Sequence, residues 1–144
     1  AAIELEAVAD PTENSYYQCE IFIPEKGSIP QSGSRIVNTD TIIHQIYADI
    51  LAGCSIPTIS ARFHNTLARL VVETCQSIRT EQGIQKVVLS GGVWQNMTLL
   101  AKTIDLLFKY DFQVYTHSSV PPNDGCIALG QAAIAYHRSH EFMS

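Results

Sequence analysis

The sequence has little of what marks several large protein classes. Its 144 residues include 8 glycines, 6 prolines and 16% charged residues, which is the composition of a globular chain and excludes a disordered tail, a collagen-like fibre and a coiled coil. No apolar run approaches the roughly 18–20 residues that a membrane span needs. Fourteen acidic against nine basic residues give a net charge of −5. We therefore expect no nucleic-acid or membrane partner, although a few backbone N–H groups can still bind an anion.

Cysteine is also sparse. The four cysteines, at positions 19, 54, 75 and 126, lack the close spacing of a zinc ribbon or a C-x-x-C motif. A chain with 46% apolar residues can bury a core without disulfides, so we expect free thiols. Cys75 falls in an apolar helical pattern, which is typical of a small buried hydrophobe. The first residues have no signal-peptide pattern, and we expect a cytoplasmic protein.

Residues 1–38 carry weak patterns. Residues 3–9 are typical of the end of a helix, YYQCEIFI at 16–23 predicts a strand, and 25–35 has the composition of a loop. We interpret this part as the edge strand and loop region of a single partial domain that spans 1–144.

Residues 39–144 carry stronger periodicity and predict an α/β core. The first helix is expected to be capped by Thr39 or Asp40 and to stop at Gly53. Its buried stripe is predicted to comprise Ile42, Ile43, Ile46, Tyr47, Ile50 and Leu51. A longer helix is expected from about Thr58 to Gly83. Its predicted stripe is Phe63, Leu67, Leu70, Val71 and Ile78.

The second half of the core alternates strands and helices. Residues 86–90 predict a central parallel strand, 97–108 a helix, 112–116 another strand and 127–137 a helix of small residues. The order helix, helix, strand, helix, strand, helix indicates an α/β fold with right-handed crossovers.

The first candidate site is SGGVWQN at 90–96, after a predicted strand. Ligands of open α/β sheets bind beyond the carboxyl ends of strands. Gly91 and Gly92 permit positive φ and close approach of a phosphate or ribose, and the next helix is expected to offer free N–H donors. Asn96, one turn into that helix, is placed to bond a ribose or to stay solvated. The turn matches neither a P-loop, a dinucleotide fingerprint nor a nucleophile elbow, so a purely structural role stays open.

The second candidate site is the turn around Asp124, in VPPNDGCIALGQ at 120–131. Two prolines stiffen it, and Gly125 allows close packing. Asp124 has two interpretations. It is either a helix N-cap, worth about 1 kcal/mol, or a metal-binding carboxylate at the same sheet edge as the glycine turn. Taken alone, the pattern favours the cap.

The histidines form no obvious ligand set. His64 either borders a cleft or pairs with a neighbouring carbonyl. His137 and His140 have helical metal spacing but stand beside a polar terminus, where a solvated face is expected. His44 and His117 belong to no constellation, and the chain contains no H-x-x-x-H pair.

The two turns together resemble the C-terminal end of the HypF carbamoyltransferases, a family of hydrogenase maturation proteins. Their pattern is S-G-G-V-F-Q-N and then P-P-N-D-G-G-I-A-L-G-Q. Here SGGVWQN begins at 90 and VPPNDGCIALGQAAIA begins at 120. ARFHNTLA at 61–68 and the opening AAIELEA are also similar, so the resemblance covers nearly the whole chain. Trp94 and Cys126 depart from the pattern but leave the aspartate in place.

The resemblance implies a fold and site residues. The fold would be the C-terminal lobe of an actin, sugar kinase and Hsp70-like ATPase fold, as in the tRNA threonylcarbamoyl transferase family. Gly91, Gly92 and Asn96 would contact the nucleotide. Asp124 would bind a divalent metal, iron or zinc, together with an H-x-x-x-H pair expected upstream of residue 1.

The resemblance also implies a reaction. The family converts carbamoyl phosphate and ATP into carbamoyl adenylate. It then passes the carbamoyl group to the C-terminal cysteine of the partner HypE, for the cyanide ligands of nickel–iron hydrogenase. This lobe alone is expected to be inactive. Two alternatives stay open: an O-carbamoyltransferase of antibiotic or nodulation-factor biosynthesis, and a non-catalytic nucleotide-binding or docking lobe. AAIELEA and the PPNDG turn favour HypF.

Overall fold

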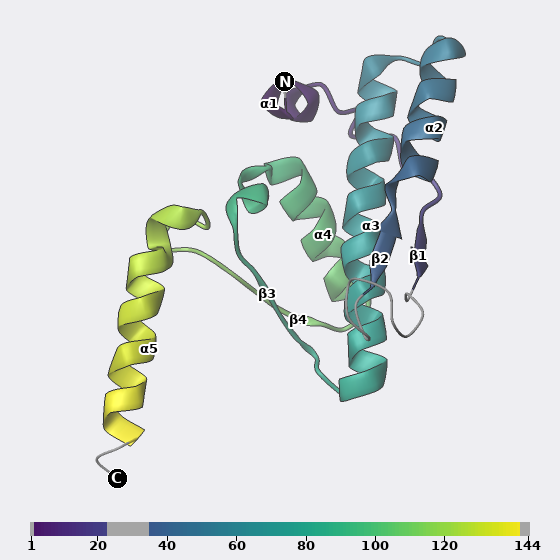
Figure 1. Ribbon diagram of the computed structural model, residues 1–144. Coiled ribbons are helices and arrows are strands. Elements are labelled where there is room, and N and C mark those ends of the chain that lie inside the picture. Colours follow the sequence, from purple (N-terminus) through teal and green to yellow (C-terminus); the bar gives the residue numbers. More distant parts are fainter. Residues whose placement is uncertain (1, 23–34, 142–144) are drawn as a thin grey trace.

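The computed structural model describes residues 2–22 and 35–141, which form helices around two small sheets (Figure 1). In chain order the elements are α1 (Ala2–Ala7), β1 (Glu20–Phe22), β2 (Ile36–Asn38), α2 (Thr39–Leu51), α3 (Ile56–Gln82), β3 (Lys86–Leu89), the short 3₁₀ turn η1 (Gly92–Gln95), α4 (Met97–Lys109), β4 (Gln113–Thr116), the 3₁₀ turn η2 (Asp124–Cys126) and α5 (Ile127–Glu141). β3 and β4 pair in parallel, as the sequence predicts, and β1 and β2 pair antiparallel. No helix in this described part is both long and apolar enough to cross a membrane.

α2 starts and stops close to the predicted positions. Its N-cap is Asn38, whose side chain accepts a hydrogen bond from the N–H of Asp40 at 3.2 Å, so the expectation of a Thr39 or Asp40 cap is wrong. Gly53 follows the helix with a φ of 75°, which confirms the predicted stop.

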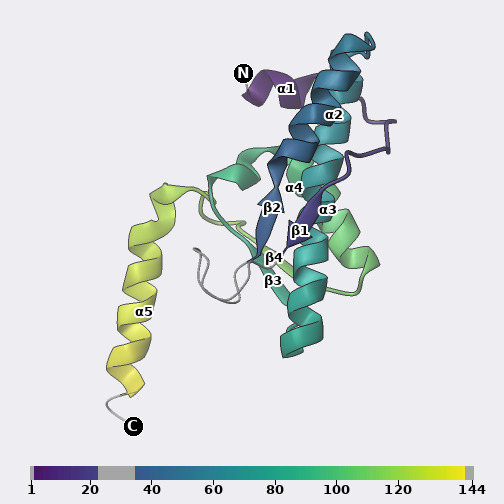
Figure 2. The same ribbon diagram turned by 45° about the vertical axis from the view of Figure 1, so that its right-hand side comes forward.

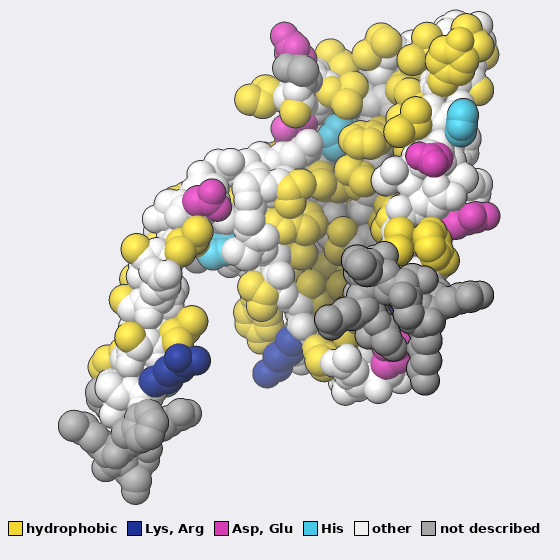
Figure 3. Space-filling view, viewed as in Figure 1, with side chains coloured by type: hydrophobic (Ala, Val, Ile, Leu, Met, Phe, Trp, Pro, Cys, Tyr) yellow, Lys and Arg dark blue, Asp and Glu magenta, His cyan; other side chains and the backbone are white. Residues whose placement is uncertain are grey.

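The predicted apolar stripe of α2 is mostly at the surface. Only Ile42 is buried, whereas Ile43 and Leu51 are 61% and 70% exposed. The helix runs along the outside of α3 in two views (Figures 1 and 2), so only one edge of its stripe is covered. Figure 3 shows hydrophobic side chains gathered over the α2 end of the molecule.

α3 begins two residues before the predicted start and buries a different face. Ser55 caps it, with the hydroxyl accepting from the N–H of Thr58 at 3.3 Å, and Gly83 at φ 71° ends it as predicted. The expected stripe is only half-buried. The buried side chains are instead mostly small or polar: Ile59, Ser60, Ala61, His64, Asn65, Thr66, Ala68 and Val72.

Polar side chains of α3 bind the N-terminal segment, which explains why the buried face of α3 contains polar residues. Asn65 Nδ2 donates to the carbonyls of Glu13 and Ser15 at 3.0 and 2.8 Å, and Thr66 Oγ1 accepts from the N–H of Tyr17 at 2.8 Å. The Thr66 bond to Tyr17, and the bonds from the Gln45 side chain to the backbone of Gln18, take up backbone groups of the predicted strand 16–23, and β1 begins only at residue 20. Residue 23 and most of the predicted loop 25–35 lie outside the described residues.

The hydrophobic core lies where the β3–α4–β4 unit packs on α3. Its buried centre is Val72, Leu89, Leu107 and Phe112. Partly buried residues packed around it are Cys75, Val87, Trp94, Leu100, Ile104, Leu106 and Val114. All four cysteines are free, as expected, and burial raises the pKa of the Cys75 thiol.

The other face of the small parallel sheet is open. Val88 of β3 is 68% exposed, so this strand, predicted to be central and buried, is covered on one side only. α5 stands apart from the rest of the chain in Figures 1 and 2, and its described side chains, residues 127–139, are all exposed. The helix itself, predicted at 127–137, is confirmed and extends to Glu141.

Candidate functional site

The two turns singled out in the sequence meet at the carboxyl edge of the β3–β4 sheet. The parallel register sets Leu89 opposite Thr116, so the residues that follow both strands leave the sheet side by side. The N–H of Gly91 donates to the carbonyl of Pro122 at 2.7 Å. This bond joins the glycine turn directly to the proline-rich turn, as the shared sheet edge predicts.

The two glycines of the first turn are not equivalent. Gly91 has φ 107° and ψ 160°, a conformation open only to glycine. Gly92 is outside the positive-φ region, so only Gly91 uses the conformation that the two glycines permit. Gly92 starts η1, whose first turn has no side-chain cap, so backbone N–H groups there are left for an outside acceptor. Trp94 holds this turn against the core.

The N-terminus of α4, in contrast, is already filled. Glu6 Oε1, from α1, accepts from the N–H groups of Met97 and Thr98 at 2.7 and 3.2 Å. A carboxylate is favoured at the positive end of a helix dipole. The expectation of free donors on this helix is therefore wrong, and η1 alone offers them next to the glycines.

Asn96 is the N-cap of α4 and lies one residue before it, not one turn inside it. Its Oδ1 accepts from the N–H of Leu99 at 2.8 Å, and its Nδ2 lies 2.9 Å from Nε2 of His64. The amide is thus held by two internal partners. A role in nucleotide binding would use its remaining hydrogen and lone pair.

His64 pairs with a neighbouring carbonyl, which is one of its two predicted roles. It is 2% exposed, and Nδ1 lies 2.8 Å from the carbonyl oxygen of Ser60. With Nδ1–H donating to that carbonyl, Nε2 is left to accept from Asn96. The histidine therefore connects α3 to the residue that follows the glycine turn.

Asp124 opens η2 but does not cap it. The cap is Asn123, whose Oδ1 accepts from the N–H of Gly125 at 3.0 Å. Asp124 is exposed, and no described residue donates a hydrogen bond to its carboxylate. The N-cap interpretation is wrong, because asparagine occupies that position. A Cβ on Gly125 would lie 3.1 Å from Asn123 Oδ1, which accounts for the glycine there.

Asp124 is also alone as a metal ligand within the described chain. Residues 2–22 and 35–141 contain no group of three or more His, Cys, Asp or Glu side chains that could hold a metal ion. The carboxylate is free and exposed, so it fits as one ligand. Further ligands would have to come from elsewhere.

Ser90 and His117 form a pair that sequence reasoning missed. His117 Nε2 lies 2.8 Å from Ser90 Oγ. Each residue directly follows one of the two parallel strands, at one step beyond the Leu89–Thr116 pair. The register would have revealed the contact, and the expectation that His117 has no partner is wrong. His137 is exposed, as predicted, and the side chain of His140 is outside the described residues.

Comparison with known proteins places the chain among carbamoyltransferases. The family model described as "Carbamoyltransferase, Kae1-like Domain, second subdomain" matches residues 1–131. Carbamoyltransferase HypF of Synechocystis is 45% identical over 73 residues, which are 51% of this chain and 9% of that protein. The probable carbamoyltransferase HypF of Methanocaldococcus jannaschii is 28% identical over 114 residues, 77% of this chain and 15% of that protein.

Two solved structures agree with this. Full-length HypF, crystallised in a phosphate- and nucleotide-bound form, matches with a TM-score of 0.83 and 41% identity, over 93% of this chain and 17% of that one. HypF of T. kodakarensis matches with a TM-score of 0.69 and 26% identity, over 93% of this chain and 16% of that one. The chain thus spans less than a fifth of the length of these proteins.

Proposed function

This chain belongs to the HypF family of carbamoyltransferases, and on that premise we propose that it is the C-terminal lobe of a carbamoyl-transferring module with an actin, sugar kinase and Hsp70-like fold. The reaction takes the carbamoyl group of carbamoyl phosphate, through carbamoyl adenylate made with ATP, to the C-terminal cysteine of HypE, and AMP is the leaving group when the thiol attacks the adenylate. That thiol carbamate is the source of the cyanide ligands of nickel–iron hydrogenase. The relatives that carry the HypF name favour this over transfer to a hydroxyl acceptor.

The observation that carries the proposal is the 2.7 Å bond between the Gly91 N–H and the Pro122 carbonyl. It holds the uncapped start of η1 and the free carboxylate of Asp124 on adjacent turns of one sheet edge. The N–H groups at the start of η1 bind phosphate oxygens of the adenylate, and the bare backbone at Gly91 and Gly92 lets the ligand approach. Asn96 borders the ribose from the cap of α4. A full-length relative was crystallised with phosphate and a nucleotide, which supports nucleotide binding in this family.

Asp124 supplies one ligand to a divalent metal, iron or zinc. No described residue donates a hydrogen bond to the Asp124 carboxylate, so its oxygens are available to a cation. Hard and borderline cations favour such oxygen ligands. When bound, such a metal supplies Lewis-acid polarisation of a ligand oxygen. A histidine pair outside this chain completes the ligand set.

The acceptor thiol comes from the partner. Partial burial raises the pKa of Cys19 and Cys75, so these two thiols are poorly ionised near neutral pH. In this proposal the fold provides binding and orientation, while HypE provides the nucleophile.

The test is Asp124→Asn in a chimera in which this chain replaces the matching segment of a full-length HypF. Asparagine keeps the size and removes the charge. Because Asp124 makes no cap, stability should be unchanged, while bound metal by elemental analysis and carbamoylation of the HypE cysteine should both be lost. The matched control is Asp111→Asn, at an exposed turn with φ 60°, which asparagine tolerates. Full metal content and normal transfer in the Asp124 variant would refute the ligand role.

A further inference from the structure

A cavity lies away from the sheet edge, between α3, α4 and the N-terminal segment. Its volume is about 410 Å³, within the range of small-ligand sites. Arg69 of α3 and Lys102 and Lys109 of α4 line it, with Asp105 as its one carboxylate. In a chain with nine basic residues and a net charge of −5, three of the nine meet at this one cavity. The local charge is opposite in sign to that of the chain.

Arg69 is the best-placed cation of this group. Its guanidinium lies 3.9 Å over the ring of Tyr16, and its buried Nε has no hydrogen-bond partner among the described residues. Arg62, by comparison, binds Asp49 and Ser15. A buried donor without a partner is destabilising. Stacking holds one face of Arg69, while the planar fork stays available for a carboxylate.

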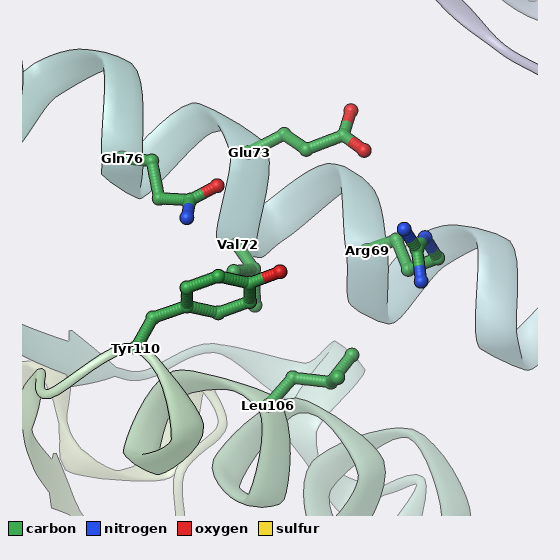
Figure 4. A pocket seen from close by; sticks show the side chains of 6 residues that line it. All are labelled: Arg69, Val72, Glu73, Gln76, Leu106 and Tyr110. Carbon is green, nitrogen blue, oxygen red and sulfur yellow. The ribbon is translucent and has the colours of Figure 1, made fainter.

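A smaller cavity, with a mixed polar and apolar lining, continues from the first and shares Arg69 and Leu106 with it. Figure 4 shows Val72 and Gln76 of α3 on one side, Leu106 of α4 and the following Tyr110 on the other, and Glu73 at the rim. We call the two cavities together the α3–α4 groove. One end is cationic, and the other combines Val72, Leu106 and the Tyr110 ring with the polar side chains of Glu73 and Gln76.

The charges of the groove are spread along its length. Lys102 and Lys109 stand seven residues apart on α4, which is two helical turns or about 10 Å. Asp105 lies between them and repels a compact anion placed at the middle. On a peptide in the extended polyproline II conformation, residues three apart lie on the same face at a separation of about 9 Å, so two carboxylates at that spacing match the two lysines and straddle Asp105.

We propose that the α3–α4 groove binds an extended acidic peptide segment. One carboxylate pairs with Arg69 and Lys102 and the other with Lys109, while an apolar side chain between them lies on Leu106. This assignment rests on the groove alone and is independent of carbamoyl transfer.

The probe is a fluorescein-labelled peptide with glutamates at its first and fourth positions and Leu-Ala between them. Its anisotropy is followed with the chain, and a peptide with glutamines in both places is the comparison. We expect saturable binding that salt weakens and that the glutamine peptide does not show. Lys102→Gln and Lys109→Gln should each weaken binding several-fold and Arg69→Gln roughly tenfold. Lys86→Gln, an exposed lysine on β3, should leave it unchanged.

The outcomes separate peptide binding from general anion binding. Equal binding of the glutamine peptide, or equal loss in the Lys86 variant, would overturn the proposal. If inorganic phosphate displaces the probe at concentrations similar to those at which the unlabelled glutamate peptide does, the groove is a site for small anions instead. Thermal unfolding checks each variant. If Arg69→Gln does not fold, the exposed Lys109→Gln decides the result, because that side chain supports no packing.

Discussion

Gly91→Ala tests the strained turn at the sheet edge. At φ 107° and ψ 160°, alanine costs about 1–3 kcal/mol in backbone strain. An added Cβ would meet nothing within 4 Å, so no clash contributes. If the backbone relaxes instead, the bond to the Pro122 carbonyl is lost, which costs about 1 kcal/mol. By either route we expect the free energy of unfolding to fall by about 1–3 kcal/mol.

The neighbouring glycine is the matched control. A Cβ on Gly92 would lie 3.9 Å from Gln95 Oε1, an ordinary contact, and its φ is not positive. Gly92→Ala should change stability by less than about 1 kcal/mol, with a gain possible from the stiffer unfolded chain. Urea unfolding is followed by circular dichroism and by fluorescence of Trp94, the one tryptophan, which sits in this turn. Equal destabilisation by both substitutions would refute the reasoning. Nucleotide affinity, measured separately in the chimera, should fall for Gly91→Ala.

Two further substitutions probe the contacts behind the site. Asn96→Ala removes a helix cap and the partner of buried His64. Thermal unfolding should show that the free energy of unfolding falls by about 2 kcal/mol, and a fall of less than about 0.5 kcal/mol would contradict this. Partial burial raises the pKa of Asp49, but hydrogen bonds from Arg62 and Tyr17 outweigh it and hold the pKa below its usual value. This stabilisation is present above about pH 4 and lost as the pH falls below it, so Asp49→Asn should lower stability at pH 7 and flatten its fall between pH 5 and 3 in urea titrations.

Element positions follow well from the sequence where the signal is local. Gly53 and Gly83 end helices where predicted because the left-handed conformation after a helix favours glycine. The parallel β3–β4 pair follows from alternating strands and helices. β2 was not predicted, because three residues are too few to show a period.

Burial was harder to predict because it depends on distant partners. The buried face of α3 is polar, since Asn65 and Thr66 bind backbone groups some fifty residues away in sequence, at separations of 52 and 49. Apolar periodicity cannot detect such a face. The meeting of the two site turns was predictable from the parallel sheet. The contact between the Glu6 carboxylate and the N-terminus of α4 was not predictable, because Glu6 precedes Met97 by 91 residues.

The exposed helix α5 has a consequence for hydrogen exchange. Fifteen residues without a packed face are marginal as a helix in water, so its amides should exchange orders of magnitude faster than those of buried α3. η2 and Asp124 precede α5 without a break. Any surface that covers α5 and slows its opening also orders this loop. The entropy cost of ordering the loop then arises only once, which links the covering of α5 thermodynamically to the cation affinity that we propose for Asp124.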